Sequence, residues 1–163
     1  MVTLKKIKIT SDNMKDCIAL DVAPDQKDFV YSNAIMLALD HDYNAKGMPM
    51  ECHAIYADDK MVGLIAYNYY IDDPFFKETC YRIRPMMVDK NCLDKGYEVA
   101  ALGQLLEEIK TKPHGEATAI FATYDPEEEV MGKIYKAAGF MKTDLNWEAE
   151  DPDDNDIITR MSL

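Results

Sequence analysis

The sequence contains no apolar run that approaches the roughly 18–20 residues needed to cross a bilayer. Residues 1–6 lack the apolar core of a signal peptide, so we expect a soluble, cytoplasmic protein. Basic residues are also scarce: 18 Lys and Arg stand against 30 Asp and Glu, which gives a formal net charge of −12. Nucleic acids and anionic membranes are bound by basic surfaces, so both are disfavoured as partners. A cationic small molecule is compatible with this charge.

Cysteine and histidine are few, and neither forms a motif of known chemistry. The cysteines include no C-x-x-C pair, and their spacing suits neither zinc nor a disulfide framework: Cys17, Cys52, Cys80 and Cys92. The nucleophile elbow, the Walker A loop and H-E-x-x-H are all absent. We therefore expect free thiols and no metal site.

The length and the charge distribution predict one domain with an acidic end. The chain has 163 residues, of which 48% are hydrophobic, so residues 1–163 can build a single core. Residues 144–163 hold seven acids and one base, which is half of the net charge. The simplest interpretation of this acidic stretch is solubility, and attraction of a cationic substrate is the alternative.

Hydrophobic periodicity predicts strands that alternate with helices along the chain. The expected strands are 3–9, 52–57, 61–70, 81–88, 118–124, 140–147 and 157–163. The expected helices run from Ser11 or Asp12 to Leu20, from Gln26 to His41, over 95–110, and from Pro126 to Gly139. The unit 81–124 is a strand–helix–strand crossover, which makes its two strands parallel. The turn 89–97 then places a helix N-terminus where a phosphate could bind, although Gly96 in that turn could serve chain reversal alone.

Two segments resemble the acetyl-CoA motifs of the GCN5-related N-acetyltransferase (GNAT) superfamily. The first comprises residues 81–89 (YRIRPMMVD), 94–97 (DKGY) and 100–102 (AAL). The second runs from residues 124–127 (YDPE) to 134–140 (IYKAAGF), which is similar to the family ending L-Y-x-x-x-G-F. Residues 20–26, together with Phe29, Val30 and Asn33, resemble the bacterial spermine/spermidine acetyltransferase branch. The resemblance covers nearly the whole chain.

This resemblance implies an α/β (α+β) fold with a mixed, mostly antiparallel sheet, a central parallel crossover and flanking helices. Acetyl-CoA would lie between strands 81–88 and 118–124, with its pantetheine arm along Met87 and Val88. Its pyrophosphate would bind backbone N–H groups in the turn that contains Asp94, Lys95, Gly96, Tyr97 and Glu98. Glu128 occupies the position of a family asparagine on the cofactor side. The resemblance also suggests a homodimer.

The implied reaction is direct attack of a neutral amine on the thioester, which needs a proton acceptor and a proton donor. Tyr135 would protonate the departing CoA thiolate, and the alternative role for Tyr135 is a core aromatic on an amphipathic helix. Glu51, Glu78 and Asp89 are candidate bases, with a water chain as the other option. The acceptor would be a small cationic amine, and the resemblance to the spermine/spermidine branch narrows this to a polyamine. A protein or an antibiotic as the acceptor is the alternative.

Three residues depart from the family pattern at the cofactor site. Leu93 stands where Gln or Arg is usual, Glu98 where a small residue is usual, and Glu128 where Asn is usual. Leu93 removes a polar contact, and Glu98 adds bulk and negative charge near the expected pyrophosphate. Two hypotheses follow: an acetyl-CoA-dependent N-acetyltransferase, or a non-catalytic relative that binds a ligand or partner and binds CoA weakly.

Overall fold

An eight-stranded sheet forms the centre of the computed structural model, which describes residues 1–147 and 154–163. The strand order is β1-β2-β3-β4-β6-β8-β7, and β5 pairs with β3 off this path. The pair β4–β6 is parallel, and the other pairs within the described residues are antiparallel. The strands are β1 (Val2–Lys6), β2 (Met50–Ala57), β3 (Lys60–Asp73), β4 (Glu78–Ile83), β5 (Met87–Val88), β6 (Ala119–Tyr124), β7 (Met141–Lys142) and β8 (Ile157–Ser162).

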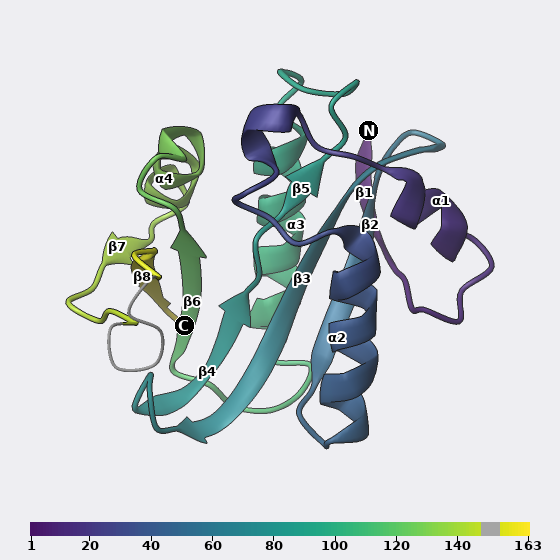
Figure 1. Cartoon of the computed structure of the whole chain (residues 1–163). Coiled ribbons are helices and arrows are strands. Elements are labelled where there is room, and N and C mark those ends of the chain that lie inside the picture. The colour runs from purple at the N-terminus through teal and green to yellow at the C-terminus, as the bar shows by residue number, and fades with distance from the viewer. Residues whose placement is uncertain (148–153) are drawn as a thin grey trace.

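Helices cover both faces of this sheet (Figure 1). They are α1 (Met14–Ala19), α2 (Asn33–Ala45), α3 (Tyr97–Lys110) and α4 (Glu129–Ala137), with a 3₁₀ turn, η1, at Pro24–Gln26. Helices α1 and α2 pack on one face and α3 on the other, while α4 lies beyond the end of β6 (Figure 1). This arrangement confirms the predicted mixed α/β fold with a parallel crossover between flanking helices. No helix in the described part of the chain is long and apolar enough to span a membrane.

The central strand β3 is buried on both faces because its side chains alternate between two cores. Ile65 and Tyr67 join the cluster under α3. Leu64 and Ala66 join the cluster under α1 and α2. All four cysteines are buried and unpaired. Burial of apolar surface on both sides of the sheet is therefore the main stabilising contribution to this fold.

The structure corrects the boundaries of four predicted elements. The helix expected to start at Gln26 starts at Asn33 and ends at Ala45, because the Ser32 hydroxyl accepts a hydrogen bond from the Ile35 amide and caps it there. The helix expected from Pro126 starts at Glu129. The strand expected over 140–147 is reduced to β7. Of the acidic stretch predicted between the last two strands, residues 148–153 lie outside the described residues.

The strand expected over 81–88 is divided into β4 and β5. The Arg84 amide still donates to the Ala66 carbonyl, but Pro85 has no N–H with which to continue the ladder. Strand β5 resumes against β3, where Gly63 pairs with Val88. A Cβ atom at Gly63 would lie 2.3 Å from the Met87 carbonyl oxygen, so only glycine permits this approach.

This division makes neighbouring strands diverge. Parallel pairing between β4 and β6 runs from Cys80 and Ala119 to Ile83 and Ala122. Beyond that point β5 stays with β3, whereas Thr123 and Tyr124 pair with β8. An opening therefore forms between β5 and the end of β6.

Candidate active site

The opening between β5 and β6 is lined by side chains from distant parts of the chain. Met86 forms one side, Thr123 and Tyr124 form the other, and Tyr135 reaches in from α4. We call this opening the crevice. It shares lining residues with two larger cavities, of about 380 Å³ on the α3 side and about 480 Å³ on the α2 side. The crevice thus lies between the two cavities and adjoins both at the point where the sheet opens.

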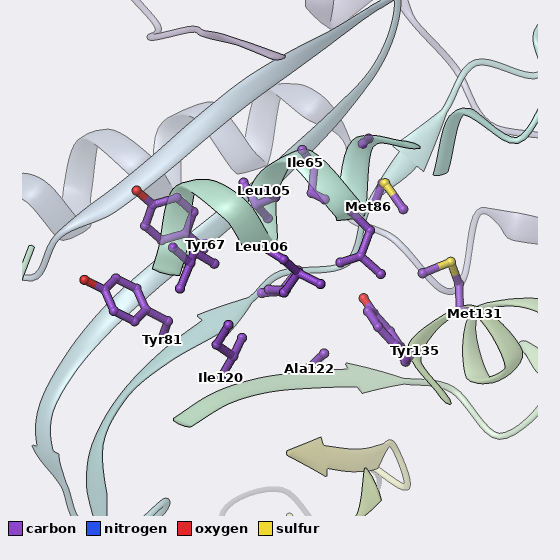
Figure 2. Packing of buried hydrophobic residues seen from close by; sticks show 14 of the residues in the cluster. Ile65, Tyr67, Tyr81, Met86, Leu105, Leu106, Ile120, Ala122, Met131 and Tyr135 are labelled. Atoms are coloured by element: carbon purple, nitrogen blue, oxygen red, sulfur yellow. The ribbon is translucent and has the colours of Figure 1, made fainter. Parts of the chain in front are cut away.

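Tyr135 is buried beside the crevice and is 1% exposed. Its ring packs against Tyr124 and Phe140, with ring centroids 6.2 and 5.4 Å away. A Cβ atom at Gly132 would lie 2.7 Å from the Tyr124 ring, so this glycine lets α4 approach β6. In Figure 2 the Tyr135 hydroxyl points toward the Met86 side of the crevice. Burial, followed by the nearby Glu128 charge, raises the pKa of Tyr135, so the phenol is protonated at neutral pH and can donate a proton.

Three carboxylates line the same crevice, Asp125, Glu128 and Asp156, and two of them have raised pKa values. Burial, with smaller contributions from Asp125 and Asp156, raises the pKa of Glu128 to about 7. Burial, with Asp154 and Asp125, raises the pKa of Asp156 to about 6. Neither Glu128 nor Asp156 forms an ion pair within residues 1–147 and 154–163. Carboxylates with pKa values near neutrality can accept a proton at physiological pH.

The α3-side cavity collects most of the residues predicted for cofactor binding. Met87, Val88, Asp94, Glu98 and Glu128 all line it. Lys95, Gly96 and Tyr97 form the start of α3 beside it. Gly96 has a φ of 71°, and an added Cβ would meet nothing within 4 Å, so this glycine serves the backbone turn rather than close approach of a ligand.

The electrostatics of this cavity oppose its backbone geometry. The N-cap residue of α3 is Gly96, which has no side chain that could accept hydrogen bonds from the first turn. The N–H groups of that turn, with their partial positive charge, are therefore available to a ligand. The cavity wall, however, carries six carboxylates and no Lys or Arg among its described lining residues: Asp25, Asp94, Glu98, Glu127, Glu128 and Glu129. The backbone fits a phosphate, whereas the side chains repel one.

The α2-side cavity has a different lining, with both signs of charge. Arg82 and Arg84 come from β4 and the link to β5. Asp125, Asp154 and Asp156 come from the ends of β6 and the approach to β8. The segment 27–31 closes another side of this cavity.

Comparison with solved structures identifies this architecture. An acetyltransferase of the GNAT family from Bacillus cereus is 20% identical, covers 99% of this chain and 97% of its own, and has a TM-score of 0.63. A GNAT family acetyltransferase from Elizabethkingia anophelis with acetyl-CoA bound is 15% identical over 99% and 98%, with a TM-score of 0.62. A ribosomal-protein-alanine N-acetyltransferase from Brucella melitensis is 12% identical over 100% and 99%, with a TM-score of 0.67.

The chain has the GNAT fold. At these identities the likeness establishes the fold and leaves the activity to be argued from the site. No protein-family model and no curated protein matches the sequence.

Within this GNAT fold, two of the three candidate bases are held by other groups. Asp89 accepts hydrogen bonds from the Asn91 amide (3.0 Å), the Asn91 side chain (2.8 Å) and the Asp21 amide (3.1 Å). Burial raises its pKa, but the hydrogen bonds from Asn91 and Asp21 outweigh burial and lower it overall. Glu78 binds Arg160 through both oxygens, at 2.8 and 3.0 Å, and this hydrogen bonding lowers its pKa. Both groups are anchors of the GNAT fold rather than free bases.

Glu51 lies away from the crevice. It pairs with Lys6 at 3.2 Å, and its other neighbours are Lys8 and His114, each at 3.8 Å. Its strand partner is Tyr67, and Figure 2 places Tyr67 at the opposite end of the apolar cluster from Tyr135. The sequence hypotheses therefore overlooked Asp156 as a base and treated Glu128 only as a cofactor contact. The sequence did single out Glu128, which precedes α4, as a departure from the asparagine of the family pattern. Asp156 had no such signal, because it is one of several acids in the same stretch.

Proposed function

We propose that the protein is an N-acetyltransferase that moves the acetyl group of acetyl-CoA to a primary amine of a small cationic acceptor. The observation that carries this proposal is the crevice, where a buried tyrosine meets two carboxylates with raised pKa values between diverging strands. Neighbours of the same fold include GNAT acetyltransferases, one of them with acetyl-CoA bound, which supports acetyl transfer as the reaction class.

In the proposed reaction, the amine loses a proton to Glu128 or Asp156 and its nitrogen attacks the thioester carbonyl carbon. The new C–N bond forms, the C–S bond breaks, and the thiolate takes a proton from Tyr135. The attacking nitrogen then gives up its remaining extra proton, which restores the phenol form of Tyr135. A carboxylate with a pKa of about 7 or about 6 is a better acceptor of the amine proton than an ordinary carboxylate, because its basicity is closer to that of the amine. General acid and general base assistance of this kind each contribute about 10²–10⁴-fold.

Acetyl-CoA would bind along the free edge of β5 and across the start of α3. Within the described residues β5 pairs with β3 alone, so Met87 and Val88 can offer backbone groups to a pantetheine arm. The turn from Asp94 to Glu98 would hold the pyrophosphate through backbone N–H groups. The six carboxylates of the cavity wall make this binding weaker than the backbone alone would give.

The acceptor is proposed to be cationic because acids dominate both the crevice and the chain as a whole. A protonated amine is attracted to Asp125, Asp154 and Asp156, which line the α2-side cavity. A polyamine is the narrowest form of this proposal and is the first substrate to test.

The test is release of CoA thiol with acetyl-CoA and a panel of amines, including spermidine, other diamines, amino acids and N-terminal peptides. We expect turnover with at least one small cationic amine and acetylation of its nitrogen by mass spectrometry. Absence of turnover across the panel at high acetyl-CoA would overturn the proposal. Calorimetry with CoA would then decide whether the ligand-binding alternative, favoured by Leu93 and Glu98, stands in its place.

A further inference from the structure

The α2-side cavity opens directly onto the proposed reaction point. It has a volume of about 480 Å³ and shares Phe29, Pro85, Thr123, Asp125 and Asp156 with the crevice. A ligand that fills this cavity therefore contacts Asp156 and lies beside the crevice that Tyr135 lines. This is the side from which an acceptor amine would approach, since the other cavity contains the residues proposed for the cofactor.

Two arginines line this cavity, of which Arg84 is buried and Arg82 is half-buried. Arg84 is 7% exposed; its Nε donates to the Asn68 side-chain oxygen at 2.6 Å and its Nη2 to the Tyr70 hydroxyl at 3.3 Å. Arg82 lies over the Trp147 ring, with 4.8 Å from its guanidinium carbon to the ring centroid. The Nε atom of Arg82 is buried and has no hydrogen-bond partner among the described residues.

Neutral groups hold these guanidiniums in position but do not balance their charge. Across residues 1–147 and 154–163, the only ion pair between an arginine and a carboxylate joins Arg160 to Glu78. Burial, and then the neighbouring Arg84, lowers the pKa of Arg82, whereas Tyr70 and Tyr43 raise it, and the Arg82 charge also acts on Asp156. A buried cation without a counter-ion is costly, and an anionic ligand would relieve that cost.

Acidic side chains also line this cavity: Asp125 follows β6, and Asp154 and Asp156 precede β8. The cavity therefore offers carboxylates to an ammonium group and guanidiniums to a carboxylate or a phosphate, because a guanidinium matches both planar and tetrahedral oxyanions. A polyamine has no anionic group for Arg82 and Arg84, and these guanidiniums repel its ammonium groups.

Resting on the proposed acetyl transfer, we propose that the acceptor is a small zwitterionic amine. Its anionic group binds Arg82 and Arg84, and its amine lies between Asp156 and Tyr135. The inference narrows the substrate class from any cationic amine to an amine that carries an oxyanion.

Matched acceptors test this inference, because lysine is 1,5-diaminopentane with one added carboxylate. We expect kcat/KM for lysine to exceed that for 1,5-diaminopentane by roughly 10- to 100-fold, the usual range for a charge-assisted hydrogen bond. Phosphoethanolamine against ethanolamine gives the same comparison for a phosphate, and the larger of the two ratios identifies the oxyanion. Arg82→Gln should remove most of the preference, because kcat/KM for lysine should fall toward the value for 1,5-diaminopentane. Arg160→Gln, an arginine outside the cavity, is the matched control and should keep the preference.

The outcomes separate this inference from the proposed function. If the diamine is acetylated as well as lysine, the acetyltransferase proposal stands and the zwitterion proposal is overturned, since the chain itself must then balance the guanidiniums. If no amine is acetylated, calorimetry decides: lysine must bind the wild-type protein more tightly than 1,5-diaminopentane, and Arg82→Gln must abolish the difference. Equal binding of the two ligands would overturn the inference there as well. Circular dichroism of Arg82→Gln, with Arg82→Lys as a second variant, excludes misfolding as the cause.

Discussion

Two regions of this molecule bury titratable side chains, and they differ in how those side chains are paired. The first is the crevice with Tyr135, Glu128 and Asp156. The second, which we call the β2–α3 cluster, contains Glu51, His53, Tyr67, Glu108 and His114.

In the β2–α3 cluster each carboxylate has partners. Glu108 lies 3.1 Å from the His53 Nε2 atom and accepts a 3.1 Å hydrogen bond from the Tyr67 hydroxyl. Glu51 pairs with Lys6 at 3.2 Å. In the crevice, by contrast, Glu128 and Asp156 form no ion pair among the described residues, and both have raised pKa values. Burial alone therefore does not mark a functional group, whereas a raised pKa beside a cavity, outside any ion pair, favours one.

The largest expected effect compares the two buried tyrosines. Tyr135→Phe removes the proposed proton donor, so kcat should fall by about 10²-fold or more while CoA affinity and folding change little. Tyr67→Phe removes a hydrogen bond to a carboxylate in the β2–α3 cluster, so stability should fall by about 1–3 kcal/mol with kcat unchanged. Steady-state kinetics, CoA calorimetry and urea unfolding of both variants measure these effects. Equal kinetic losses in the two variants would contradict the distinction between the regions.

The sequence was sufficient for the features that depend on local pattern. The crossover from β4 through α3 to β6 follows from two apolar strands around one amphipathic helix. Tyr135 was selected as a candidate because it stands four residues before Gly139, which has a φ of 102° just beyond the end of α4, and because this spacing resembles a family motif. Pro85 could have predicted the interruption between β4 and β5, because proline lacks the N–H that a strand ladder needs. The apolar residues on both sides of Pro85 instead suggested one continuous strand.

The remainder depends on contacts between residues far apart in the chain. Asp89 is held by the amide of Asp21, 68 positions away, and Glu78 by Arg160, 82 positions away. No periodicity in the sequence reveals that these hydrogen bonds lower the pKa of Asp89 and Glu78, while burial raises the pKa of Glu128 and Asp156. The same holds for Arg82 and Arg84, which were visible as part of a strand motif but not as uncompensated charges.

A second, smaller effect is the pH dependence of kcat/KM, which should respond to a carboxylate of the crevice and not to one of the β2–α3 cluster. Glu128 must be ionised to accept a proton, so wild-type kcat/KM should rise as the pH increases through about 7, the raised pKa of this group. Glu128→Gln should remove that inflection and lower the rate by about 10- to 100-fold, with Asp156 supplying the remaining activity. Glu108→Gln, in the β2–α3 cluster, should leave the inflection in place. An unchanged inflection in Glu128→Gln would assign the base to another group.

The same group gives a signature in stability. The pKa of Glu128 rises from an ordinary 4.5 to about 7 on folding, so the native state holds a proton that the unfolded chain releases. Stability contributed by this group is therefore greatest below about pH 4.5 and declines as the pH rises toward 7. Urea unfolding across this range should show a shallower decline in Glu128→Gln, with Asp156 causing part of what remains.

The smallest expected effect is a change in CoA affinity, and it concerns the acidic wall of the α3-side cavity. A carboxylate about 6 Å from a phosphate costs roughly 0.7 kcal/mol in a water-like dielectric and nearly 3 kcal/mol at an effective dielectric of about 20. Glu98 lies on this wall at the start of α3, so Glu98→Gln should strengthen CoA binding by about 3- to 10-fold at low salt. The gain should shrink as salt is added, because exposed charges are screened. Glu107→Gln, on the same helix but paired with Lys110 away from the cavity, is the control and should change nothing. Equal CoA affinity in wild type and Glu98→Gln at every salt concentration would mean that the backbone N–H groups of α3 bind the phosphate without interference from Glu98.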